Sequence, residues 1–211
     1  MPDLQDLLTK TAALHDHLCP RQVLGVRTGL LAARLFGLDL PQAGKCLFAF
    51  VETDGCYSDG VSVSTGCWLG HRTLRLVDYG KVACTLVDTQ TGKALRITPN
   101  PAARATALLR AREAPDPWHA QLVAYRTMPD DELLRVLPVS LSVSLQSIIS
   151  RPGLRVECAM CGEEIMNARE VLLDGRALCR RCAGVESYYC AEAGDPPDLQ
   201  ALHHTLLDRH E

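Results

Sequence analysis

The chain has 211 residues, 47% of them hydrophobic and 22% charged, which is enough material for one full domain and a second, smaller one. A net charge of −3 provides no overall positive field for phosphates, so nucleic-acid binding is not expected. No stretch approaches the roughly 18 uninterrupted apolar residues of a membrane-spanning helix, so no membrane association is expected either.

The N-terminus and the cysteine content both indicate the cytoplasm. The first residues, MPDLQDLLTK, carry carboxylates where a signal peptide would carry cations. Ten cysteines could form a disulfide scaffold, but a chain of this length does not need such cross-links to fold. In a reducing compartment, cysteines serve as free thiols, metal ligands or reactive groups.

Two helices are predicted at the start of the chain. Leucines recur at helical spacing from Leu4 to Leu14, and Asp3 is placed to cap this helix. Pro20 suits the first turn of a second helix, which should end at Gly37. The sequence HDHLC lies between the two helices.

Four strands should follow, joined by turns at residues 78–80 and 91–92 into an antiparallel meander. They are expected at Lys45–Glu52, Thr73–Val77, Val82–Asp88 and Ala94–Thr98. Cys46 and Cys84 lie on the inward-facing side of their strands, at every second position with apolar residues, so both should belong to the core.

Helices are expected again at residues 101–112, from Asp116-Pro117 onward, and at 130–137. In the run VSLSVSLQSII, residues 139–149, apolar residues alternate strictly with serines, which predicts a further strand. The predicted fold class is therefore α+β, an antiparallel meander sheet with flanking helices, followed by a small C-terminal metal domain.

The C-terminal region contains the motif of a four-cysteine zinc site. Two Cys-x2-Cys pairs are separated by seventeen residues, a spacing that fits tetrahedral coordination, and the ligands are Cys158, Cys161, Cys179 and Cys182. Gly162 and Asp174-Gly175 supply the turns of a zinc-ribbon or treble-clef-like fold. A closed site of four thiolates favours a structural role, with a binding module for nucleic acid or protein as the alternative.

Ser150 to Gly153 reads as a linker, because the metal motif begins immediately beyond it. We expect an α+β domain over residues 1–150, a four-cysteine zinc finger over 151–190 and a tail over 191–211. The tail should contain a helix with His203, His204 and His210 on a solvated face.

A second cluster of possible ligands precedes Pro20. Because a residue before proline disfavours the helical conformation, this segment should be extended, which would point His15, His17 and Cys19 to one side. The positive end of the following helix would favour a thiolate or an anionic ligand there. The alternative is that one histidine packs or caps and Cys19 is a buried small side chain.

Polar residues just beyond the first predicted strand strengthen the case for a site. Glu52, Asp54, Cys56 and Asp59 lie where binding residues commonly gather, at the end of a buried strand. The glycine-flanked segment Thr65–His71 adds Cys67 and His71.

These motifs resemble the FmdE family of formylmethanofuran dehydrogenase components, small proteins encoded beside molybdenum or tungsten enzymes and also found alone. The matching pieces are HDHLCP (15–20), VETDGCYSDG (51–60), TGCWLGH (65–71), DYGK (78–81), MPDDELL (128–134), CAMCGEEIMNAR (158–169) and LCRRC (178–182). The resemblance implies an α+β domain that forms homodimers, a metal site around the His-x-His-x-Cys motif and an optional zinc finger. It also implies a helix near residues 58–65, although Val61 and Val63 alternate as in a strand.

The resemblance implies His17, Cys19 and Cys56 as ligands of a second metal, with His15 and Cys67 as alternatives. Zinc is expected there, with iron or nickel as alternatives. Glu52 and Asp59 are expected to orient the ligands or carry protons. Glu52, Asp59, Cys67 and His71 together form the expected cofactor pocket.

The chain departs from the family at three places around this pocket. Arg21 replaces a glycine, and Trp68 and His71 replace threonine and lysine, so the contacts to a cofactor should differ.

Three functions are consistent with these features. The first is a metal-dependent protein that binds a small anionic ligand or cofactor, as an accessory of a molybdenum or tungsten enzyme of one-carbon metabolism. The second is a zinc-finger adaptor or regulator that dimerises through its N-terminal domain. The third is a metal delivery protein. No motif in the sequence assigns a reaction.

Overall fold

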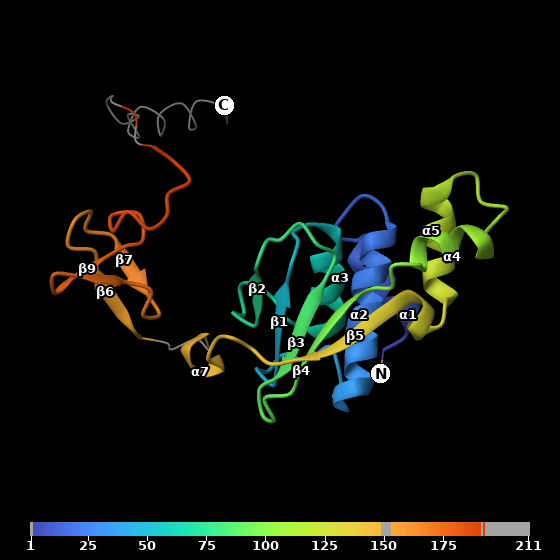
Figure 1. The fold of residues 1–211 in the computed structure, drawn as a ribbon, viewed down its shortest axis with the longest axis horizontal. Helices are drawn as coiled ribbons and strands as arrows, with labels where there is room; N and C mark the ends of the chain where they lie inside the picture. The colour runs from blue at the N-terminus through green and yellow to red at the C-terminus, as the bar shows by residue number, and fades with distance from the viewer. Residues whose placement is uncertain (1, 149–152, 191, 193–211) are drawn as a thin grey trace, which may run out of the picture. The chain divides into compact units, whose positions relative to one another are not determined.

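The computed structural model describes residues 2–148, 153–190 and 192 (Figure 1). The chain divides into two compact units, Met1–Ile149 and Ser150–Glu211, which are described separately. The predicted tail helix with its three histidines lies outside the described residues. Among the helices that are described, none is both long and apolar enough to cross a membrane.

The first two helices follow the predicted pattern closely. Helix α1 (Leu4–Ala12) is capped by Asp3, whose carboxylate accepts a hydrogen bond from the backbone N–H of Gln5 at 3.0 Å. Helix α2 (Pro20–Phe36) starts at the predicted proline and ends at Gly37, whose φ of 65° is left-handed. Helix α3 (Cys56–Thr65) confirms the helix that the resemblance implied, against the strand-like alternation of its valines.

A five-stranded sheet forms the centre of the first unit, in the order β2-β1-β3-β4-β5. Its strands are β1 (Leu47–Val51), β2 (Leu74–Leu76), β3 (Cys84–Asp88), β4 (Ala94–Pro99) and β5 (Leu134–Val139). Strands β1, β3, β4 and β5 are antiparallel neighbours, and the α+β class is confirmed. Strand β2, however, pairs with β1 in parallel, so the predicted simple meander is wrong at this step.

The reason for this difference is the connection between β1 and β2. Helix α3 and the loop after it carry the chain back to the start of β1, where β2 joins the free edge in the same direction. The turn at residues 78–80 therefore carries the chain from β2 across to the opposite edge of β1.

The last strand of the sheet also lies earlier than predicted. Helix α6 (Asp130–Leu133) is short, and β5 follows it directly, pairing Val136 with Ile97 on β4. The serine-rich run after it contains the short helix α7 (Leu145–Ile148) instead of a strand. Leu141 and Leu145 from this run pack on the second face of the sheet, around Phe48, and this burial accounts for their apolar spacing.

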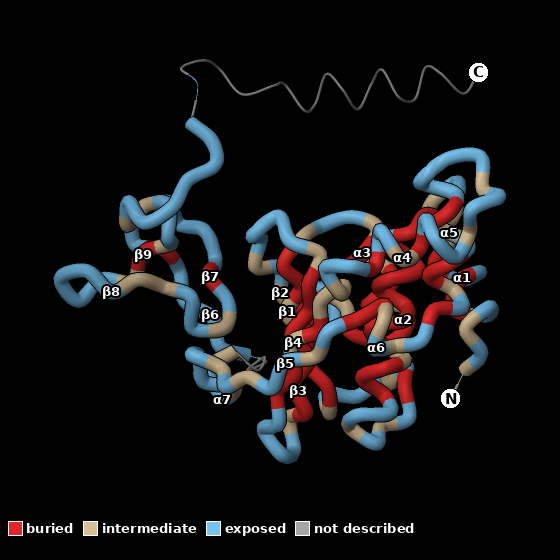
Figure 2. Tube along the Cα trace, turned by 45° about the vertical axis from the view of Figure 1, so that its right-hand side comes forward, coloured by how far each residue is buried: buried red, intermediate tan, exposed pale blue. Residues whose placement is uncertain are grey.

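Helices α2 and α3 cover the first face of the sheet, and the main core lies between these helices and the sheet (Figure 2). Cys84 is fully buried in this core as predicted, whereas Cys46 is only half-buried. Helices α4 (Ala103–Arg110) and α5 (Pro117–Thr127) pack against each other, and α5 also packs against α2.

The second unit consists of two small hairpins. Strands β6 (Arg155–Glu157) and β7 (Glu164–Met166) form one, and β8 (Val171–Leu173) and β9 (Arg176–Leu178) form the other. The predicted turns are confirmed, because Gly162 and Gly175 both have a φ of 74°. Cys158, Ile165 and Leu178 are the buried residues of its small core.

Candidate metal and ligand sites

The four cysteines of the second unit form a compact metal centre. Their sulfur atoms all lie within 4.8 Å of one another. Zinc–sulfur bonds of about 2.3 Å in a tetrahedron require sulfur atoms about 3.8 Å apart, so this donor set fits zinc. Among the described residues, no other group of three or more ligand atoms is gathered this closely.

Backbone amides support the thiolates of this centre. The N–H of Cys179 donates to the Cys158 sulfur at 3.3 Å, and that of Cys182 donates to the Cys179 sulfur at 3.4 Å. Amide hydrogen bonds from Cys161 and Cys179 lower the pKa of Cys158 to about 6. The ionised form that metal binding needs is thus stabilised at Cys158, whereas a hydrogen bond with the Cys179 thiol raises the pKa of Cys182 to about 12.

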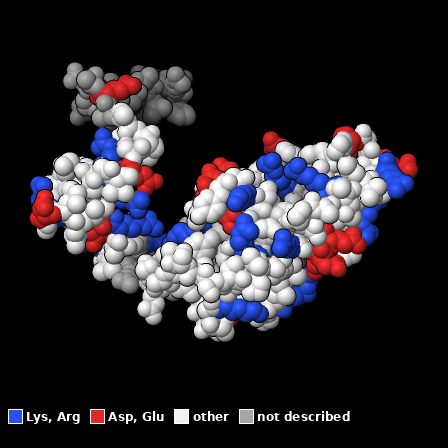
Figure 3. Space-filling model, in the orientation of Figure 1, with Lys and Arg blue, Asp and Glu red and all other residues white. Residues whose placement is uncertain are grey.

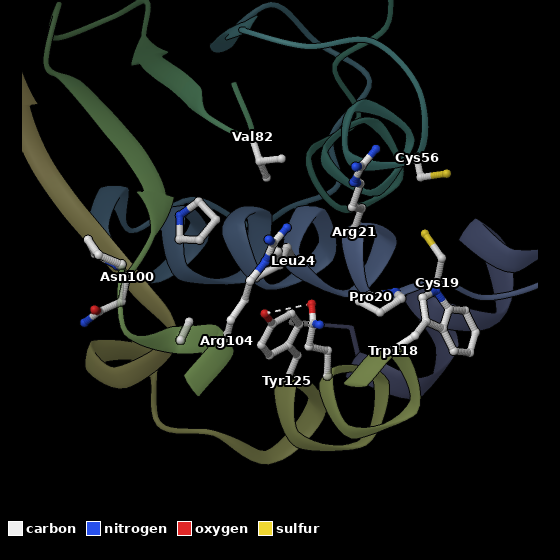
Figure 4. A pocket seen from close by; sticks show the side chains of 14 residues that line it. Cys19, Pro20, Arg21, Leu24, Cys56, Val82, Asn100, Arg104, Trp118 and Tyr125 are labelled. Atoms are coloured by element: carbon white, nitrogen blue, oxygen red, sulfur yellow. Dashed lines mark hydrogen bonds between the residues drawn. The ribbon is translucent and has the colours of Figure 1, made fainter. Parts of the chain in front are cut away.

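The first unit contains a cavity of about 650 Å³, of a size suited to a small molecule. Its lining comes from helices α2, α3, α4 and α5, from Val82 just before β3, and from the end of β4 and the loop after it (Figure 4). The chemically distinctive lining residues are two thiols, two guanidinium groups and two aromatic rings: Cys19, Cys56, Arg21, Arg104, Trp118 and Tyr125. Arg104 extends into the middle of the cavity in Figure 4.

Lysine and arginine side chains are also spread over the outer surface of the first unit, interspersed with carboxylates (Figure 3). The face in view carries no broad region of a single charge. On this face, charge alone therefore marks no single binding surface.

Hydrogen bonds around Arg27 fix α5 and its Tyr125 against α2. The Arg27 guanidinium donates to the carbonyl of Tyr125 at 2.8 Å and to that of Met128 at 2.7 Å. Because Arg27 is buried, this contact anchors the C-terminal end of α5. It holds one wall of the cavity in place.

Cys19 and Cys56 stand at the first turns of two neighbouring helices. Cys19 caps α2, and its backbone N–H donates to the Gln22 side chain at 2.7 Å. Gln22 in turn donates to the carbonyl of Thr11 at 3.1 Å, which ties α2 to the end of α1. Cys56 is the first residue of α3, after Gly55. Burial and a hydrogen bond with the Cys19 thiol raise the pKa of Cys56.

The two histidines of the predicted motif have different environments. His15 is half-buried, and its Nε2 lies 2.8 Å from Oδ2 of Asp59 on α3. His17 is exposed to solvent, and neither histidine lines the cavity. The structure therefore brings Cys19 and Cys56 together and places His15 on Asp59, but it gathers no complete four-ligand set among these described residues.

Three further residues of the predicted cofactor pocket do not line this cavity. Glu52 is buried and accepts two hydrogen bonds from Arg96, at 2.6 and 2.7 Å. Cys67 is fully buried in the main core, its sulfur donates to the carbonyl of Leu47 at 3.5 Å, and burial raises its pKa to about 11. His71 is exposed.

The sequence reasoning missed Arg104, Trp118 and Tyr125. They belong to two helices whose apolar spacing is ordinary for amphipathic segments, so nothing local marked them. Only the packing of α4 and α5 near α2 brings them to Cys19.

A family model described as FmdE, molybdenum formylmethanofuran dehydrogenase operon, matches residues 14–135, more than half of the chain. The chain belongs to the FmdE family. A second model, the prokaryotic DksA/TraR C4-type zinc finger, matches residues 152–188 and supports the zinc site of the second unit.

Two individual proteins are similar to this FmdE-family chain. The crystal structure of a tungsten formylmethanofuran dehydrogenase FmdE-like protein from Syntrophus aciditrophicus has a TM-score of 0.59 and 22% identity, covering 88% of this chain and 95% of the other, which shows a shared fold. A probable S-adenosyl-L-methionine-binding protein from Archaeoglobus fulgidus is 31% identical over 206 residues, covering 88% of this chain. The alignment spans 54% of the archaeal protein, about half of its length.

Proposed function

We propose that this FmdE-family chain binds a metal ion and a small anionic molecule at the cavity of its first unit. The observation that carries the proposal is that Cys19 and Cys56, from the first turns of two helices, line the same cavity as Arg21 and Arg104. Thiols suit a metal ion, and guanidinium groups suit a carboxylate or phosphate. The groups for the metal ion and the groups for the anion thus line one cavity.

Cys19 and Cys56 would supply two ligands for a zinc ion, with iron or nickel as alternatives. His15 or His17 would complete the set after a local movement, because both lie on the short segment that ends at Cys19. The contact between His15 and Asp59 is the kind of carboxylate–histidine pair that fixes the orientation of a ligating imidazole. A bound metal would supply Lewis-acid character at the mouth of the cavity.

The remaining lining would hold an anionic molecule with a flat ring. Arg104 offers paired N–H donors to a carboxylate or phosphate, and Trp118 and Tyr125 offer faces and edges for stacking. Arg21, which replaces the glycine usual in the family, adds a second guanidinium to this wall. Its presence at the lining suggests an anion preference particular to this chain.

S-adenosyl-L-methionine is a specific candidate for this ligand. The archaeal relative carries that name, and the molecule, although a cation overall, combines a carboxylate that a guanidinium can bind with an adenine ring that can stack on Trp118 or Tyr125. The volume of about 650 Å³ accommodates a molecule of this size.

Calorimetric titration of the reduced chain with S-adenosyl-L-methionine tests this assignment. Arg104→Gln should weaken binding about tenfold or more, because a charge-assisted hydrogen bond contributes roughly 1.5–3 kcal/mol. Arg112→Gln is the matched control, since Arg112 is outside the cavity lining. The assignment fails if the wild type shows no binding or if both variants bind equally.

For its partners, we propose a homodimer that assists a molybdenum or tungsten enzyme of one-carbon metabolism. The description of the matching family model supports this role. Co-purification with such an enzyme from a native source would test it, and a chain that always elutes alone would argue against it.

A zinc-finger adaptor is the second candidate function, supported by the match of residues 152–188 to the DksA/TraR finger. In that case Arg104→Gln and changes at Cys19 would leave partner binding intact, whereas disruption of the four-cysteine centre would abolish it.

Metal delivery is distinguished by chelator competition, because a delivery site would release its metal far faster than the closed centre.

A further inference from the structure

Close backbone contact sets α2 and α3 in register. A Cβ added at Gly25 would lie 2.3 Å from the carbonyl oxygen of Tyr57 and 2.9 Å from Cα of Gly60. One turn further, a Cβ at Gly29 would lie 2.0 Å from Oγ of Ser64. The two helices therefore run side by side in the same direction, separated only by the space that glycine leaves.

The same register applies at the first turns of the two helices. Gly25 faces Gly60 and Gly29 faces Ser64, so the offset between facing residues is constant along the pair. Carried back to the helix starts, this offset places Cys56 beside Arg21, and Cys19, two residues before Arg21, lines the same cavity as Cys56. Figure 4 shows the two sulfur atoms at the same side of the cavity.

The two thiols also interact, because the neighbouring Cys19 thiol contributes, after burial, to the raised pKa of Cys56. Both cysteines are free and line the same cavity, Cys56 half-buried and Cys19 buried with 7% of its surface exposed. Cys67 and Cys84, in contrast, are fully buried in the main core, where an oxidant has no access. Cys19 and Cys56 are thus the two thiols of the first unit's described residues that line the cavity, and an oxidant would reach them first at the half-buried Cys56.

We propose that Cys19 and Cys56 form a reversible disulfide that switches off the cavity site. A low-molecular-weight disulfide such as oxidised glutathione is the co-reactant. The thiolate of one cysteine attacks it, forming a mixed disulfide and releasing one glutathione. The second cysteine then attacks the mixed disulfide, forming the Cys19–Cys56 bond and releasing the second glutathione. The two protein thiols lose two electrons and two protons, and one glutathione disulfide becomes two thiols.

The consequence for the cavity rests on the proposed function. A disulfide has no thiolate to offer a metal, so oxidation would remove both sulfur ligands at once. Because the glycine contacts hold α2 and α3 against each other, we expect the bond to leave the fold intact. The switch would be local, and a reductant would reverse it.

Peptide mapping of the oxidised full-length chain tests the disulfide directly. Reduced protein, with and without added zinc, is treated with oxidised glutathione, its remaining thiols are alkylated, and the digest is analysed by mass spectrometry. We expect a peptide that joins Cys19 to Cys56, which disappears on reduction and forms more slowly with zinc present. In Cys19→Ser, Cys56 should carry glutathione instead, and Cys190→Ser, which alters an exposed thiol, should form the joined peptide normally.

Separate readouts distinguish the switch from the proposed function. Glutathione on both Cys19 and Cys56, or disulfides of either with another cysteine, would overturn the switch. The metal content of the reduced chain tests the proposed metal site alone. If both hold, oxidation should release the metal of the first unit while the four-cysteine centre keeps its own, and reduction should restore binding.

Discussion

Glu52 lies just beyond β1, and the structure gives its carboxylate a structural partner. Its side chain is 9% exposed and forms a two-pronged ion pair with Arg96 on β4. This pairing raises the pKa of Arg96, as expected when the charged form is stabilised. Loss of the guanidinium would leave a buried carboxylate without its partner.

Arg96→Met should therefore lower the free energy of unfolding by about 2 kcal/mol. The full loss of a partner in a buried pair costs roughly 3–5 kcal/mol, and we discount it because the Arg96 side chain is 29% exposed. Urea unfolding of the first unit measures the effect. Arg21→Met is the matched control at an exposed arginine and should stay within about 0.5 kcal/mol of the wild type; equal stability of both variants would contradict the role of the pair.

At the scale of elements, the contact between α2 and α3 positions the candidate site. Gly25→Ala should destabilise the first unit by about 1–3 kcal/mol, because the new Cβ meets backbone atoms of α3 that cannot rotate away. Helix propensity alone would predict a gain of roughly 0.8 kcal/mol, so the two effects have opposite signs. The change should also separate the N-termini of the helices and reduce metal binding at Cys19 and Cys56.

Gly70→Ala is the control for this experiment, since a Cβ there meets nothing within 4 Å and the backbone is not left-handed. Urea midpoints and metal content of the two variants give the comparison. A Gly25→Ala variant as stable as Gly70→Ala would show that the helices can adjust and that their close contact does not hold the site.

Elements with local signals could be predicted from the sequence. The cap at Asp3, the proline at the start of α2 and Gly37 at its end located two helices to within about two residues. The pairing of β2 and the position of β5 could not be predicted, because each depends on a partner strand distant in the sequence. Alternation in residues 139–149 was misleading, since its apolar residues pack on the sheet without joining it.

The two candidate sites differ in the same way. All four ligands of the zinc centre come from two short motifs, so spacing alone identified them. The cavity draws Cys19, Arg104 and Tyr125 from three separate helices, and only the fold assembles them. Cys67 lies in a motif of the family and yet packs in the core, which spacing could not reveal.

At the scale of the whole molecule, the two units should respond differently to metal removal. The small core of the second unit cannot replace the metal, whereas the first unit has a large core of its own. A strong chelator should therefore raise amide exchange in β6–β9 to the rate of an unfolded chain and leave that of β1 and β3 unchanged. Persistent protection in β6–β9 without metal would contradict the structural role of the centre.

Metal content per chain, measured on anaerobically purified protein, tests the central claim most directly. We predict two metal ions in the wild type and in the control Cys190→Ser. Cys19→Ser/Cys56→Ser and Cys158→Ser/Cys161→Ser should each retain one, the first in the four-cysteine centre and the second at the cavity. A wild type with a single ion, retained in Cys19→Ser/Cys56→Ser and lost in Cys158→Ser/Cys161→Ser, would contradict the metal site at the cavity.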